Sequence, residues 1–356
     1  MHYIIGCLIA AICFTGCIME DVEPEVEMVN VSISVSLADV VTSRAYEDAA
    51  NDYEKMHTLR IVIVRNAKDG VVEQNRLINL QQASTFHGTE TFEVRANEQK
   101  YIYFFVNEEY TAFDTNAEYG FNFRNDIVVG RSFPYSKLQD ARITLGVVNS
   151  KVQGMSQYLP MNSLYGLKVE SEDMDETFWV VRAATKFTYI LNNRNNQPYV
   201  LRRLEISHQA ATEYYMQRIG DVVPVWSTGN DAIQQQNTSF NTPYEGKTPY
   251  HYSFQKDFTG GITVPANGQV QLDPVYLAET KGFSDSSYKN GDENYYTTSL
   301  SFDNLESFTG KLKELDCQLP RNTHVVVTVK INQGNATWEV DVFPYTGVNL
   351  NPGFGL

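Results

Sequence analysis

Apolar and polar side chains alternate strictly over residues 29–37, within a segment that begins at Met28. An apolar residue recurs at every second position, and serine or asparagine lies between. Successive side chains of an extended strand point to opposite faces, so the pattern predicts a strand with one buried face. The residues predicted to face inward are Val29, Val31, Ile33, Val35 and Leu37.

Further strand patterns follow along the chain, whereas helical periodicity is slight. The sequence therefore predicts an all-β fold with few short helices. We expect two tandem β-sandwich domains of Greek-key or transthyretin-like type. An acidic stretch over residues 170–176 is the expected boundary, which divides the body into 45–172 and 173–345.

The first seventeen residues predict export and lipidation. Residues 3–13 are mostly apolar but too few to span a bilayer, which is typical of a signal peptide. Phe14-Thr15-Gly16-Cys17 places small residues before a cysteine, as a lipoprotein signal peptidase requires. We expect residues 1–16 to be the signal peptide and Cys17 to carry the lipid. An ordinary secretory signal with an incidental cysteine is the alternative.

Charge and motif content argue against several classes of protein. The formal net charge is −15, which disfavours a nucleic-acid partner because phosphates require a basic surface. The six histidines show no metal-ligand spacing, and neither a glycine-rich phosphate loop nor a nucleophile elbow is present. We therefore expect no enzyme activity, no cofactor and no metal.

Aromatic residues in the expected loops leave a second interpretation open. Tyrosine and tryptophan rings could stack on sugars, as in a surface glycan-binding lipoprotein, or they could fill the core and edges of the sheets. The residues concerned are Tyr214, Tyr215, Trp226, Tyr250, Tyr252, Tyr295 and Tyr296.

A second alternating segment, residues 346–356, has the same register as the first. Its apolar positions are Val348, Leu350, Pro352, Phe354 and Leu356. One segment could occupy, in a neighbouring molecule, the groove that the other leaves, because an unpaired sheet edge recruits an extended chain. Burial of five such side chains yields about 8–15 kcal/mol before the ordering entropy is subtracted.

Such a groove, filled in advance by an attached strand, would stay blocked until the connection is cut. Arg44-Ala45 is the predicted cleavage site because it lies in a polar stretch between the first strand and the body. Arg60 and Arg65 lie within or at the edge of a predicted strand, where a protease cannot engage the backbone. The alternative is a permanent edge strand followed by an ordinary loop arginine.

Three short segments resemble the fimbrillin family of Bacteroidales, the type V pilins. They are Leu159-Pro160-Met161, the run from Leu319 to Val327 that contains Pro320-Arg321-Asn322-Thr323-His324, and the tryptophan strand Trp338 to Val342. Their order along the chain carries the resemblance.

This resemblance implies an assembly cycle. Residues 17–44 would be a lipidated propeptide on the outer membrane, and an arginine-specific protease would cut after Arg44. Removal of the blocking strand, Val29 to Leu37, would admit the donor strand of the next subunit, with Val348, Leu350, Phe354 and Leu356 inward. The product would be an extracellular fimbria of this subunit and other fimbrial subunits that serves adhesion. An anchor or tip role is the alternative within the family.

Overall fold

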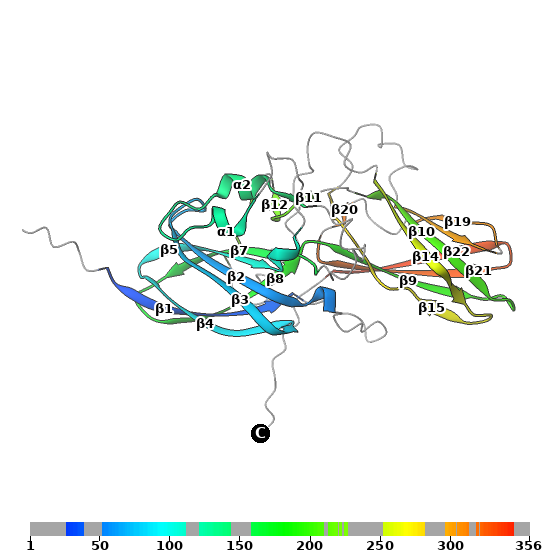
Figure 1. Cartoon of the computed structure of the whole chain (residues 1–356), viewed down its shortest axis with the longest axis horizontal. Coiled ribbons are helices and arrows are strands. Elements are labelled where there is room, and N and C mark those ends of the chain that lie inside the picture. The colour runs from blue at the N-terminus through cyan, green and yellow to red at the C-terminus, as the bar shows by residue number, and fades with distance from the viewer. Residues whose placement is uncertain are drawn as a thin grey trace, which may run out of the picture.

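The computed structural model describes residues 26–38, 52–111, 121–143, 158–209, 213–219, 221–222, 224–226, 252–281, 296–303, 305–312, 318–319 and 321–344. These residues are mostly β, as predicted (Figure 1). The helical elements among them are short: η1 (Asp52–Glu54), η2 (Glu108–Tyr110), α1 (Phe123–Asp126) and α2 (Tyr135–Asp140). None of these described helices is long and apolar enough to cross a membrane.

The first half is built on one seven-stranded sheet. Its strands, in spatial order, are β3 (Val72–Ser84), β2 (Met56–Arg65), β5 (Glu98–Val106), β7 (Met161–Val169), β8 (Met174–Arg182), β1 (Met28–Leu37) and β4 (Phe86–Arg95). The inner strands β2 and β5 are buried along most of their length, whereas the outer strands β3 and β4 expose much of theirs. This distribution follows from burial of the central strands on both faces.

The two outer strands of this sheet approach each other, so that the sheet curls around its core. The Gln74 amide donates to the Glu93 carbonyl at 2.7 Å, and the Arg95 main-chain N–H donates to the Glu73 carboxylate at 2.7 Å. Arg76 also donates to Glu90 at 2.9 Å. Side chains therefore join β3 to β4 along this seam.

The second half consists of two sheets that enclose a separate core. One contains β15 (Gln269–Gln271), β9 (Thr185–Asn193), β21 (Thr323–Asn332) and β22 (Asn335–Pro344), and β16 (Val275–Leu277) also pairs with β9. The other contains β14 (Tyr252–Val264), β10 (Tyr199–Gln209), β18 (Thr297–Phe302) and β19 (Phe308–Lys311). Phe187 and Val327 from the first sheet share this core with Leu204 and Leu300 from the second.

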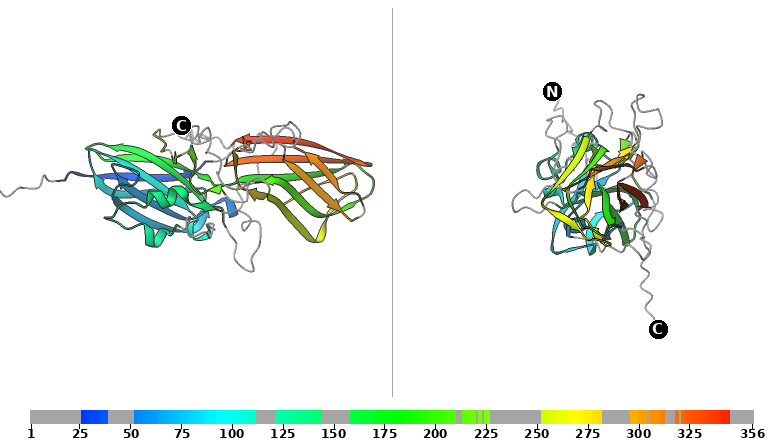
Figure 2. Two further views of the ribbon diagram at one scale, coloured as in Figure 1. Left: turned by 90° about the horizontal axis from the view of Figure 1, so that it is seen from above. Right: turned by 90° about the vertical axis from the view of Figure 1, so that its right-hand side faces the viewer.

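Three short strand pairs complete the described part of the chain: β6 (Arg142–Ile143) with β11 (Glu213–Tyr214), β12 (Arg218–Ile219) with β13 (Asp221–Val222), and β17 (Thr280–Lys281) with β20 (Gln318–Leu319). Figure 2 shows the two halves end to end along the long axis. The expected domain boundary after residue 172 stays a prediction. β8 follows this boundary in the sequence, but it pairs with β7 and β1 in the sheet of the first half.

A buried polar cluster joins the two halves. The Arg321 guanidinium donates to the Glu279 carboxylate, and it reaches the carbonyls of Tyr214 and Tyr215 at 2.7 and 2.6 Å. Arg321 belongs to one of the segments that suggested the resemblance, and all four residues of the cluster are buried. Such a guanidinium is tolerated in the interior because its donors are matched by acceptors.

A second contact between the halves runs through η1. The Glu54 carboxylate accepts from Tyr276 Oη at 2.7 Å and lies 3.0 Å from Lys186 Nζ. Burial by itself raises the pKa of Glu54, but the charges of Arg182 and Lys186 and the two hydrogen bonds outweigh it, so the pKa is lowered. Glu54 is therefore ionised at neutral pH and holds η1 against the second half.

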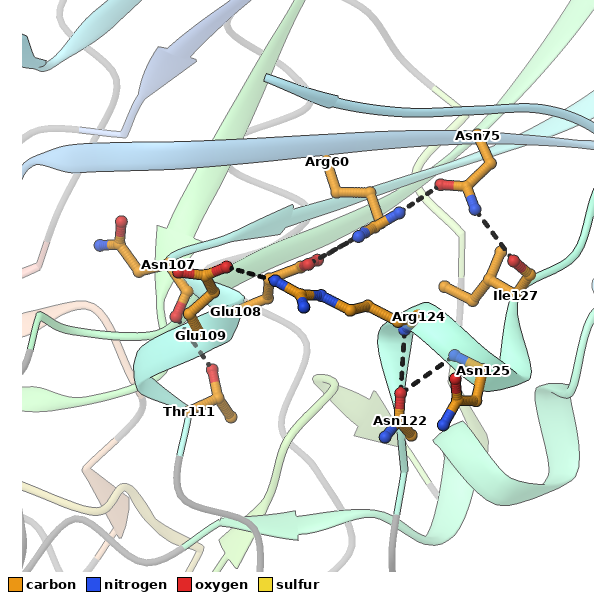
Figure 3. Close-up of polar contacts among 10 residues, drawn as sticks. All are labelled: Arg60, Asn75, Asn107, Glu108, Glu109, Thr111, Asn122, Arg124, Asn125 and Ile127. Carbon is orange, nitrogen blue, oxygen red and sulfur yellow. Dashed lines mark hydrogen bonds and ion pairs between the residues drawn. The ribbon is translucent and has the colours of Figure 1, made fainter. Parts of the chain in front are cut away.

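Polar contacts also fasten η2 and α1 to the first sheet (Figure 3). Arg60 on β2 makes a two-point ion pair with Glu108 of η2 at 2.6 and 2.7 Å, and its third donor reaches Asn75 on β3 at 2.7 Å. Asn122 caps α1 by accepting from the main-chain N–H groups of residues 124 and 125. These contacts are structural, since each group in them already has a partner.

Candidate functional site: the groove of the first strand

The first strand of the chain lies inside the seven-stranded sheet. β1 pairs antiparallel with β4, from Met28 opposite Arg95 to Ser36 opposite Phe86. On its other side, it pairs parallel with β8, from Val31 opposite Met174 to Leu37 opposite Val180. The alternative of an edge strand is therefore wrong, because β1 has a strand partner on each side.

The five side chains predicted to face inward are all buried. Their exposed fractions are at most 6%, and they belong to the core of the first half. Burial follows from the alternating pattern, because a pleated strand sends every second side chain to the same face. The role of these residues as a blocking strand stays a prediction.

The outward face of β1 is held by polar contacts. The Asp173 carboxylate, at the start of β8, accepts from the main-chain N–H of Asn30 at 2.7 Å and from its side-chain amide at 3.2 Å. Both hydrogen bonds lower the pKa of Asp173, and the main-chain hydrogen bond has the larger effect. On the side of β4, the Ser32 hydroxyl forms a hydrogen bond with the Thr91 hydroxyl at 3.3 Å. The Ser34 hydroxyl forms one with the Thr89 hydroxyl at 3.2 Å.

The end of β1 reaches the junction between the halves. The main-chain N–H of Ala38 donates to the Val180 carbonyl at 3.0 Å. The Ala38 carbonyl accepts from the Arg182 guanidinium at 3.2 Å and from the Asn322 amide at 3.3 Å. Asn322 adopts the left-handed conformation, with φ of 58°, which asparagine tolerates better than most residues. Both halves therefore hold the last residue of the segment.

Without β1, this sheet would contain a groove suited to an extended chain. Neighbouring strands lie about 4.8 Å apart, so β8 and β4 would be separated by about 9–10 Å, the space of one strand. Both would present unpaired main-chain groups along an apolar floor. Such a groove binds a strand that alternates apolar and polar residues, and binding requires no reactive group.

The other residues predicted for the assembly cycle lie outside the described residues. These are Cys17, Arg44, Ala45, Val348, Leu350, Phe354 and Leu356. Their roles stay predictions.

Of the seven aromatic residues considered for sugar stacking, three lie inside the protein. Tyr214, Tyr215 and Tyr296 are buried, as their alternative interpretation as core residues requires. Trp226 is 51% exposed and lies over Gly166, while Tyr250 and Tyr295 fall outside the described residues.

Within the described part of the chain, no three histidine, cysteine or acidic side chains gather as metal ligands would.

Sequence reasoning missed the polar contacts at both ends of β1. Asp173 belongs to the acidic stretch that we interpreted as a domain boundary, and Asn30 was simply an outward position. Asn322 lies in a segment that carried the resemblance, but its spacing gave no sign of a contact with Ala38. No local pattern indicates these pairings, because the partners are far apart in the chain.

Comparisons with known proteins find similarity in structure only. No protein-family model matches the chain, and no curated protein matches its sequence. A candidate cell adhesion protein from Parabacteroides distasonis superposes with a TM-score of 0.52 at 11% identity, covering 90% of this chain and 98% of the other. The tip fimbrial protein Mfa3 from Porphyromonas gingivalis, in a form truncated at its C-terminus, gives 0.52 at 12% identity, covering 88% and 99%. Over about nine tenths of its length, the chain shares its fold with these fimbrial and adhesion proteins.

Proposed function

We propose that this protein is a non-enzymatic structural subunit of a cell-surface fimbria of the type V pilus kind, assembled by strand exchange. The observation that carries the proposal is the place of β1, an N-terminal strand inserted between β8 and β4 with its apolar face buried. The fold shared with a tip fimbrial protein supports it. We also propose that the two cores are tandem β-sandwich domains of Greek-key or transthyretin-like type.

The precursor is a lipoprotein, with lipid on Cys17 and its site on the outer membrane. Residues 39–51 connect β1 to η1, and Arg44 lies within them. A cut after Arg44 by an arginine-specific protease leaves β1 attached by non-covalent contacts alone. Departure of β1 then opens the groove.

The partner is another copy of the chain or another fimbrial subunit. Its candidate donor strand, residues 346–356, has the same alternation as β1 and fills the open groove. A polymer of such subunits forms an extracellular fimbria and serves adhesion. Because one of the structures with this fold is a tip protein, an accessory position at the tip or anchor is the second candidate role.

Proteolytic processing tests this proposal on the protein at its native cell surface. Intact mass and N-terminal sequencing should show a new terminus at Ala45, and gels run without heating should show a ladder of polymers. Arg44→Ala should abolish both, whereas Arg131→Ala, at an exposed arginine of the body, should change neither. A lipidated terminus at Cys17 together with monomers alone would contradict the polymer and favour an anchor.

A further inference from the structure

We propose that Asp173 sets the register of the strand in the groove, by binding an asparagine that β1 and the candidate donor strand of a second copy have in common. The inference rests on the proposed function and specifies which residues of the two copies meet. Asn30 occupies the position now, and Asn349 of the second copy takes it after exchange.

The contact between Asp173 and Asn30 is made by two hydrogen bonds to one residue. One carboxylate oxygen binds the main-chain N–H and the other binds the side-chain amide. Glycine could offer only the first of these donors, and serine has a shorter side chain that carries a hydroxyl. Asp173 immediately precedes Met174, the first residue of β8, so the adjoining strand fixes where the carboxylate lies. The site therefore selects asparagine at one position of the inserted strand.

The two segments match at this position. Val29-Asn30-Val31 corresponds to Val348-Asn349-Leu350 when the five apolar positions are aligned. The remaining outward residues differ, since the serines of β1 are replaced by Asn351, Gly353 and Gly355. Asparagine is thus the outward side chain that the blocking and donor segments share in this alignment.

Alternative registers are less suitable. A shift by one residue would turn the apolar side chains away from the core. A shift by two would bring Asn351 to Asp173 and place Pro352 at the position of Val31, which has a ladder partner on each side, Phe92 and Met174. In the proposed register, Pro352 takes the position of Ile33, which also pairs with Glu90 and Glu176 but is the last residue before the pairing of β1 with β4 becomes irregular. Proline lacks the N–H that a regular ladder uses, so this second arrangement suits it better.

Polymers of the full chain provide the test. The protein is cut with an arginine-specific protease so that it assembles. The half-time for dissociation of the assembled dimer is then measured during mild heating. Asp173→Ala should shorten it about three- to fivefold and Asn349→Ala, which keeps the main-chain donor, about twofold, because these hydrogen bonds reach an exposed carboxylate. The matched controls are Glu172→Ala, an exposed neighbouring carboxylate, and Asn351→Ala, the next outward asparagine of the donor segment.

A double-variant comparison isolates the pair. Asp173→Ala combined with Asn349→Ala should be no weaker than Asp173→Ala alone, because that variant already lacks both hydrogen bonds, whereas Asp173→Ala combined with Asn351→Ala should show independent effects. Coupling of Asp173 to Asn351 instead, or losses no larger than in the controls, would overturn the inference while leaving strand exchange intact. Absence of polymers from the unaltered cleaved protein would overturn the proposed function itself. The thermal midpoint of each uncut precursor verifies that the variants fold.

Discussion

At the scale of single residues, the two arginine–glutamate pairs of Figure 3 differ in how far water reaches them. The side chains of Arg60 and Glu108 are 7% and 3% exposed, whereas those of Arg124 and Glu109 are 73% and 43% exposed. A buried carboxylate that loses its cation stays desolvated and unpaired, whereas an exposed one is simply hydrated. Similar pairs therefore contribute very differently to stability.

We expect Arg60→Met to lower the free energy of unfolding by about 3–5 kcal/mol, because Glu108 would remain buried without its cation. The matched control, Arg124→Met, should cost less than about 1 kcal/mol, since the pair is exposed and screened by water. Urea denaturation of the two variants measures both values. Equal losses would show that burial does not govern these pairs.

Glu98 gives the protein a predicted sensitivity to acid. Its hydrogen bond from Arg65 is the main cause that lowers its pKa from 4.5 to about 2, with Lys100 adding to the effect. Because the folded pKa is depressed, the stabilisation is complete above about pH 4.5 and is lost as the pH falls toward about 2. Glu98→Gln should remove this part of the pH dependence of unfolding, whereas Glu93→Gln, at an exposed position of β4, should leave it unchanged.

At the level of secondary-structure elements, a glycine on β19 leaves space for a tryptophan side chain of β22. A Cβ at Gly310 would fall within the indole of Trp338, which packs against the core of the second half. The absence of a side chain on β19 therefore makes room for the tryptophan of β22, and the two sheets of this half can close over their core.

Gly310→Ala should accordingly destabilise the protein by about 1–3 kcal/mol, the usual range for overpacking. Gly88→Ala is the control, because a Cβ there meets nothing within 4 Å. It should change stability little or raise it slightly, since alanine restricts the unfolded chain. Trp fluorescence during thermal unfolding measures both variants, and an unchanged midpoint for Gly310→Ala would contradict this account.

At the scale of the whole molecule, two cores are joined by buried polar contacts and by the end of β1. Arg321 binds Glu279 and the carbonyls of Tyr214 and Tyr215, while Asn322 binds the Ala38 carbonyl. The junction is therefore in contact with the strand that we propose to leave. Each half retains its own apolar core, so these contacts couple two units that could otherwise unfold apart.

Arg321→Met should split thermal unfolding into two transitions, because Glu279 and two carbonyls would lose their partner at the junction. Lys330→Met removes a more exposed ion pair with Glu339 within β21 and β22 and should leave the cooperativity unchanged. Differential scanning calorimetry distinguishes the two outcomes. A single transition, shifted no more than in the control, would show that the junction does not couple the halves.

Local pattern predicted some strands and not others. Residues 29–37 alternate so regularly that both the strand and its buried face follow from the sequence. β3, in contrast, is rich in glutamine and asparagine, and its pattern gave no strand signal. It forms because β2 offers it a ladder and because its side chains meet β4 across the seam.

Local pattern was enough to predict that the described residues are mostly β and which face of the first strand is buried, because strand geometry has a period of two and acts over neighbouring residues. The position of that strand in the sheet depends instead on contacts between distant parts of the chain. Its parallel partner β8 begins at residue 174, and the contact of Asn30 with Asp173 spans 143 residues. Such pairings arise when distant strands share one curled sheet and one core, and no local pattern encodes them.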